Sequence, residues 1–86
     1  RPVSSNIGRV LAVNHPYEFV VINLGEEQRM DAGMILGVYR GKELIGRIKI
    51  EKVYANMSVA DIIFESAKGI IREDDVVKSI PLENEE

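Results

Sequence analysis

The feature that most constrains the fold is an alternation of charged and apolar residues that slips by one position in the second half of the chain. Residues 47–51 alternate charged and apolar side chains, which is the period of a strand with one buried face. The next apolar residue should stand at position 52, but that position holds Lys52 and the apolar residue is Val53. One extra residue near 51–52, a β-bulge, would return Val53 to the core side and bend the strand sharply. The pattern therefore predicts a buried Val53 beside an exposed Lys52.

Short strands separated by turn residues account for most of the remaining sequence. Pro16 cannot donate to a strand ladder, so residues 15–17 form a turn between two apolar, β-branched runs, which make a hairpin. The polar interval 25–33 has a glycine at each end and is expected to be an irregular loop. The expected strands are 8–14, 18–24, 34–40, the slipping strand that starts at 46, 60–64, and a short last strand after a tight turn within 71–77.

Glycines and one helix-like stretch qualify this assignment. Residues 41–43 are expected to turn the chain, and Gly37 and Gly46 are expected where strands bend or approach closely. A helix remains an alternative for residues 58–68, because Ser58 followed by Asp61 resembles a helix N-cap with an acidic third position. As part of a strand, Asp61 is expected to face outward, away from its apolar neighbours.

Length and strand spacing together predict an all-β fold, a small barrel of about five to six strands with a strongly bent strand at 51–52. The chain has 86 residues, enough for one small core, and 45% of them are hydrophobic. Residues 1–6 are expected to be an N-terminal lead-in, 7–80 the single β-barrel domain and 81–86 an acidic tail. The tail is polar and terminal, and binding of a partner by the tail is an alternative to a frayed end.

The residue types needed for catalysis or for metal binding are scarce. The chain has no cysteine and a single histidine, His15, which is expected to be a solvated turn residue. Its acidic residues crowd the 25–33 loop and positions 74–75 without the spacing of a calcium loop. No serine stands in a nucleophile-elbow motif and no glycine loop for phosphate is present. We therefore expect no enzyme activity, no catalytic residues, no metal site and no cofactor.

A basic hairpin raises nucleic-acid binding as an alternative function. Cations interleaved with tyrosines are typical of surfaces that bind single strands. Against this, the net charge of the chain is −3, and a nucleic-acid footprint usually makes a whole domain basic. The candidate interaction surface of the 39–54 hairpin comprises Tyr39, Arg40, Lys42, Arg47, Lys49 and Tyr54.

Five local patterns carry a resemblance to a known family. They are the glycine-led first strand, the "VVINLG" strand, Ala32-Gly33-Met34, Tyr39-Arg40-Gly41-Lys42 and Ile45-Gly46. Over about residues 7–80 the chain resembles the C-terminal domain of the flagellar assembly protein T and similar modules that follow coiled coils in bacterial envelope proteins. One departure is Asp74-Asp75, where related barrels tend to have Gly-Asp, and aspartate tolerates left-handed geometry less well.

The resemblance implies an SH3-like β-barrel that serves as an accessory module, and it carries over no catalytic residues. It favours a location in the bacterial cell envelope or periplasm. The expected function is a non-enzymatic interaction or assembly module at the end of a larger bacterial protein. Protein binding or self-association would use an exposed strand edge or the 25–33 loop, and no membrane insertion is expected because no apolar run approaches about 20 residues.

Overall fold

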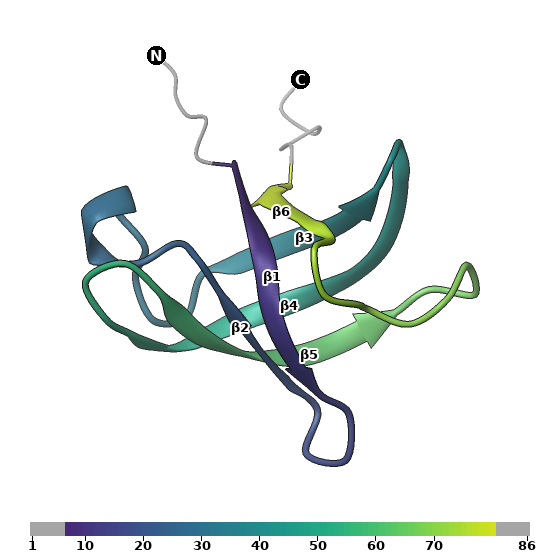
Figure 1. Ribbon diagram of the computed structural model, residues 1–86, viewed down its shortest axis with the longest axis horizontal. Coiled ribbons are helices and arrows are strands. Elements are labelled where there is room, and N and C mark those ends of the chain that lie inside the picture. The colour runs from purple at the N-terminus through teal and green to yellow at the C-terminus, as the bar shows by residue number, and fades with distance from the viewer. Residues whose placement is uncertain (1–6, 81–86) are drawn as a thin grey trace.

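Six antiparallel strands form a closed barrel in the computed structural model, which describes residues 7–80 (Figure 1). The predicted lead-in and acidic tail lie outside the described residues. The all-β prediction is confirmed, and the alternative of a helix at 58–68 is wrong, because most of that stretch is a strand. The strands are β1 (Ile7–Asn14), β2 (Phe19–Ile22), β3 (Ile35–Arg40), β4 (Glu43–Val53), β5 (Ser58–Glu65) and β6 (Val76–Ser79).

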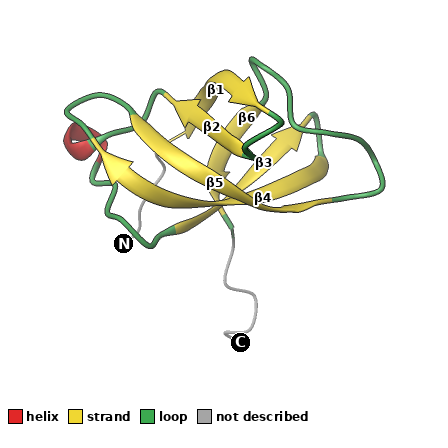
Figure 2. Cartoon of the chain, turned by 90° about the horizontal axis from the view of Figure 1, so that it is seen from below, coloured by secondary structure: helices red, strands yellow, loops and turns green. Residues whose placement is uncertain are grey.

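The barrel closes in the order β1-β2-β5-β4-β3-β6, with β6 returning to β1. Figure 2 shows the strands wrapping around a common interior when the molecule is turned by 90°. Each described strand has a hydrogen-bonded neighbour on both sides. Closure removes sheet edges, so the described strands do not offer the open edge through which we expected association.

The core is built from the inward side of every strand. In the middle of β4, Ile48 and Ile50 are buried while Arg47, Lys49 and Glu51 are exposed, as period-two patterning requires. The buried hydroxyl of Ser58 donates to the carbonyl of Leu24 at 2.7 Å, which offsets the cost of its burial. The buried apolar residues are Val10, Val20, Ile22, Leu24, Met30, Leu36, Val38, Ile45, Ile48, Ile50, Ala60, Ile71 and Val77.

The slip in the alternation is a β-bulge, as predicted. Ile50 pairs with Ala60 and Lys52 pairs with Val59, so Glu51 is the extra residue on β4. Lys52 is exposed, and Val53 is half-buried against the core rather than fully buried, because it lies at the end of the strand beside an open pocket. β4 pairs with β3 over residues 43–49 and with β5 over residues 46–53, so its middle part has a partner on both sides.

Both interior strand glycines lie where other groups approach closely. At Gly46, a Cβ would collide with the carbonyl oxygen of Phe64, and the register of β4 against β3 slips beside it. Gly37 has no such slip. A Cβ there would lie 2.6 Å from the Tyr39 ring, which covers this glycine from outside the barrel. The predicted close approach is therefore confirmed at Gly46, where the neighbour is backbone, whereas Gly37 makes room for a ring.

The 25–33 interval closes one end of the barrel. It contains a short 3₁₀ helix (Glu26–Gln28), and the amides of Glu26 and Glu27 donate to the carbonyls of Tyr54 and Ala55 at 2.7 and 2.9 Å. Met30 is buried beneath it. The loop is therefore held to the β4–β5 turn by backbone hydrogen bonds.

The turn before β6 contains a non-glycine residue, Asp74, in the left-handed region. Asp74 has a φ of 74°, in the left-handed region, so it adopts the conformation that a glycine would adopt more readily. Its carbonyl accepts a hydrogen bond from Arg9 Nη1 at 3.0 Å, and its amide donates to the carbonyl of Val10 at 2.8 Å. These two bonds hold the turn against β1.

Candidate interaction surfaces

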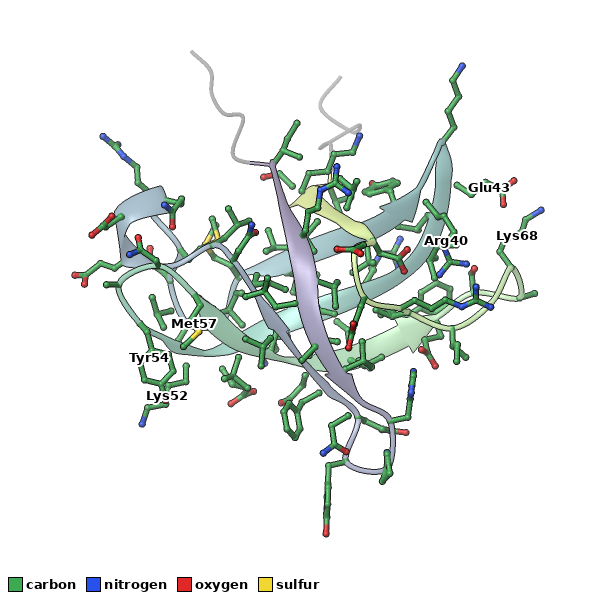
Figure 3. All side chains as sticks on the ribbon, viewed as in Figure 1. Arg40, Glu43, Lys52, Tyr54, Met57 and Lys68 are labelled. Carbon is green, nitrogen blue, oxygen red and sulfur yellow. The ribbon has the colours of Figure 1, made fainter. Side chains whose placement is uncertain are left out.

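The six residues of the predicted interaction surface lie on different parts of the barrel. Arg40 lies at one end of the barrel and Tyr54 at the other (Figure 3). Lys42 is exposed in the β3–β4 turn, while Arg47 and Lys49 face outward from β4. The predicted hairpin therefore does not present its cations and tyrosines as one surface.

Arg40 is engaged in an ion pair inside the fold. Its Nε and Nη2 donate to the two carboxylate oxygens of Asp75 at 2.9 and 2.8 Å, and Nη2 also donates to the carbonyl of Ile70. Asp75 is only 6% exposed and accepts a further hydrogen bond from the amide of Arg72. The hydrogen bonds to Asp75 raise the pKa of Arg40 further above its usual value. This cation fastens the 66–75 loop to β3.

Two cations of the outer surface lie over aromatic rings. Lys78 Nζ is 4.7 Å from the centre of the Tyr39 ring, and Arg47 Cζ is 5.4 Å from the centre of the Phe64 ring. Gly37, which the Tyr39 ring covers, pairs with both Lys78 and Arg47, and Arg47 pairs with Phe64. The cations and rings therefore alternate across four neighbouring strands. We name Lys78, Tyr39, Arg47 and Phe64 the cation–aromatic row.

Sequence reasoning missed half of this row. Phe64 and Lys78 belong to β5 and β6, which lie outside the 39–54 hairpin of the predicted surface. Alternation in the last strand could have pointed Lys78 outward, since Val77 before it is buried. Its position beside Tyr39 depends on the pairing of β3 with β6, which no local pattern reveals.

Lys49 lies one row further along, beside two acidic residues. It pairs with Asp61, which faces outward as predicted. The Asp61 carboxylate raises the pKa of Glu51 above its ordinary value, first through a hydrogen bond and then through its charge, and slight desolvation adds to the effect while Lys49 opposes it. The bulge thus places two carboxyl groups together, and Lys49 is less available to an anion than the cations of the row.

A second surface is apolar and spans β1, β2, β5 and the turn that leads into β5. Ala12 pairs with Val21, and Val21 pairs with Val59. Beside them, Leu11 is exposed because a bulge makes it the extra residue of β1. Figure 3 shows Tyr54, Met57 and Lys52 near one another at one end of the barrel, and Lys52 pairs with Val59. We name Leu11, Ala12, Val21, Tyr54, Met57 and Val59 the apolar face.

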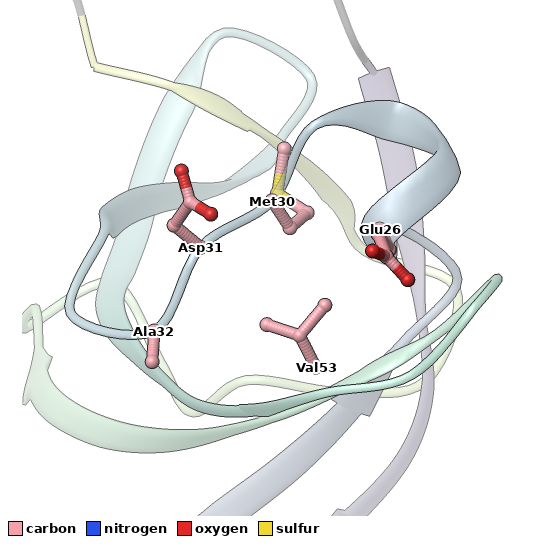
Figure 4. Close-up of a pocket in the computed structure, with 5 residues that line it drawn as sticks. All are labelled: Glu26, Met30, Asp31, Ala32 and Val53. Atoms are coloured by element: carbon pink, nitrogen blue, oxygen red, sulfur yellow. The ribbon is translucent and has the colours of Figure 1, made fainter.

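A pocket of about 290 Å³ opens beside the 25–33 loop, lined by Glu26, Met30, Asp31, Ala32 and Val53 (Figure 4). Its two carboxylates come from the loop, while Met30 and Val53 form its apolar side. The lining contains no serine, cysteine or histidine.

The single histidine, His15, contacts the backbone of a distant loop. The Nε2 of His15, predicted to be a solvated turn residue, is 3.1 Å from the carbonyl of Ile71 and joins the β1–β2 turn to the 66–75 loop. Within residues 7–80, no three histidine or acidic side chains gather in a way that could hold a metal ion. No helix in this part of the chain has the length and apolar character needed to cross a membrane.

Comparisons with known proteins add no relative: the chain matches no protein-family model, no curated protein and no solved structure. The two surfaces are therefore the features from which function can be argued.

Proposed function

We propose that this barrel is a non-enzymatic protein-interaction module that assembles through its apolar face, with a second copy of the chain as its first partner. The observation that carries the proposal is the apolar face itself. None of its six members is charged, and Leu11, Tyr54 and Met57 are each between 44% and 48% exposed. We take these exposed apolar side chains, which lie on neighbouring strands and on the turn that leads into β5, as the mark of an interaction site.

The support beneath this surface favours binding without rearrangement. Val21 and Val59 are fixed by strand pairing, and Tyr54 donates its amide to the carbonyl of Met57 across the turn at 2.8 Å. The 3₁₀ helix adds hydrogen bonds to the same turn. A rigid apolar surface loses little conformational entropy when it becomes buried.

The proposal also includes the finer expectations drawn from the resemblance. These are an SH3-like barrel, a position at the end of a larger bacterial protein, and a location in the cell envelope or periplasm. Because the barrel is closed and the 25–33 loop is bonded to the β4–β5 turn, we expect the contact to use the apolar face instead of a strand edge or this loop.

Light scattering across a concentration series, at low and at moderate salt, tests the proposal. We expect a dimer or larger species whose formation persists as salt rises, because burial of apolar surface is not screened by ions. Leu11→Glu and Met57→Glu should restore the monomer.

The matched control is Ile35→Glu. Ile35 is 48% exposed, the same fraction as Leu11, but it lies on β3 away from the apolar face. A monomer at every concentration would contradict self-association, and an equal effect of Ile35→Glu would show that association does not use the apolar face.

A further inference from the structure

We propose that the cation–aromatic row is a binding site for single-stranded nucleic acid, separate from the apolar face. The inference rests on three properties of this surface. Its cations and rings alternate, and it lies on strands that have a paired neighbour on both sides. Its four members also belong to two neighbouring lines of residues paired across the strands, and neither line contains an acidic residue.

The charge of these lines has one sign. The first line pairs Ile7, Lys78, Gly37, Arg47 and Phe64 across five strands, and the neighbouring line pairs Arg9, Val76 and Tyr39. Three of these residues are cations and none is acidic. The net charge of −3 for the whole chain therefore conceals a local surface that complements phosphate groups.

The rings distinguish a nucleic acid from an acidic protein segment. Carboxylates of a protein partner would engage the cations and leave Tyr39 and Phe64 unused. Unpaired bases stack on aromatic rings while the backbone phosphates meet neighbouring cations, so a single strand uses both kinds of side chain. In the free protein Lys78 and Arg47 lie over these same rings, and a bound base would replace each of them there and release it toward a phosphate.

The row differs from the predicted hairpin surface in its members. Tyr39 and Arg47 belong to both, but Arg40 is committed to Asp75, and Tyr54 lies at the other end of the barrel. Phe64 and Lys78, which come from other strands, complete the row. The site therefore depends on the closed barrel and would not exist on the isolated hairpin.

Fluorescence anisotropy of a labelled twelve-residue oligothymidylate, titrated with the full chain, tests the inference. We expect phosphate contacts from Arg47 and Lys78 of the row and from Arg9 beside it. With three such contacts, the logarithm of the association constant should fall with the logarithm of the salt concentration with a slope of about −2. Arg47→Glu and Lys78→Glu should each weaken binding at least about tenfold, and Phe64→Leu by about tenfold through lost stacking. A duplex of the same length should bind more weakly, because its bases cannot reach the rings.

Lys42→Glu and Lys52→Glu are the matched controls, since each makes the same change of charge outside the row. Thermal unfolding of every variant separates loss of binding from loss of fold. The same measurement is made on Lys49→Glu, a charge reversal at an exposed position beside the row. Absence of binding at low salt would overturn the inference. Equal losses in the control variants, or a polyglutamate peptide bound as tightly as the oligonucleotide, would overturn it too. Leu11→Glu should leave oligonucleotide binding unchanged, so this test is independent of the one for the proposed function.

Discussion

The apolar face and the cation–aromatic row occupy the outside of the same barrel but differ in how their side chains are satisfied. Leu11 and Met57 project apolar groups toward solvent. In the row, each cation already lies over a ring of the same protein, so its cations and rings are already in contact with each other. The apolar face can gain free energy simply by being covered, whereas a partner of the row must replace contacts that exist in the free protein.

This difference teaches that exposure alone does not identify a cation that is free to bind. Arg40 and Lys42 are close in sequence and chemically alike, yet Arg40 supports the fold and Lys42 projects from a turn. Substitutions of side chains that support the fold should lower stability more than substitutions of side chains that project into solvent.

The largest effect is expected from Asp75→Ala. Removing this buried carboxylate takes away the partner of Arg40 and the acceptor of the Arg72 amide, and should lower the free energy of unfolding by about 3 kcal/mol in urea denaturation. Glu43→Ala, which removes an exposed 3.7 Å ion pair with Lys68, should cost less than about 0.5 kcal/mol. Similar losses in the two variants would contradict the division between structural and solvated ion pairs.

The next effect separates the two strand glycines that lie near the row. Gly46→Ala should cost about 2 kcal/mol, because the new methyl group meets the backbone of β5, which cannot yield without loosening the pairing. Gly37→Ala should change stability by less than about 1 kcal/mol, because the Tyr39 ring can move aside. Denaturation of the two variants side by side provides the measurement, and the reverse order would mean that the Tyr39 ring is more rigidly held than the strand.

A smaller effect is expected from Tyr39→Leu. The variant loses the contact with Lys78 and the cover over Gly37, which should cost about 0.5–1 kcal/mol. Tyr54→Leu, a matched change on the apolar face, should stay within about 0.5 kcal/mol of the original chain. Equal melting temperatures for both variants would show that the Lys78–Tyr39 contact adds nothing to stability.

The smallest effect concerns the carboxyl pair beside Lys49. Asp61 raises the pKa of Glu51 in the folded chain, so the stabilisation from protonated Glu51 is fully present below its ordinary value of about 4.3 and is lost as pH rises through the raised value. Glu51→Gln should therefore melt slightly higher than the original chain at pH 7, and this advantage should disappear in acid. Glu73→Gln controls for the change in net charge. An advantage that is independent of pH would contradict the coupling of the two carboxyl groups.

The sequence was sufficient to predict the β class and the bulge at Glu51, because charged residues mark the outward face of β4 and make a slip visible. The bulges at Leu11 and Ile63 were missed for the opposite reason. Each lies within a run of apolar residues, where an extra residue leaves the pattern of polarity unchanged. Local patterning shows a register change only when the two faces of a strand differ in chemistry.

The candidate surfaces were less predictable than the fold. A hairpin groups residues that are close in sequence, but the row joins Tyr39 to Lys78 through the pairing of β3 with β6. The role of Arg40 depends on Asp75, which is 35 residues away and becomes its partner only after the barrel closes. These relations are set by topology, so residue type and spacing could nominate the cations but could not separate bound from available ones.

The pairing that closes the barrel also determines how the domain would respond to a pulling force. Ile7 at the start of β1 pairs with Lys78 near the end of β6, and the two strands are antiparallel, so tension applied through both ends acts on adjacent residues. Their hydrogen bonds would break one after another, as in a zipper, instead of resisting together in shear. The seam between Ile7 and Lys78 would therefore open at low force.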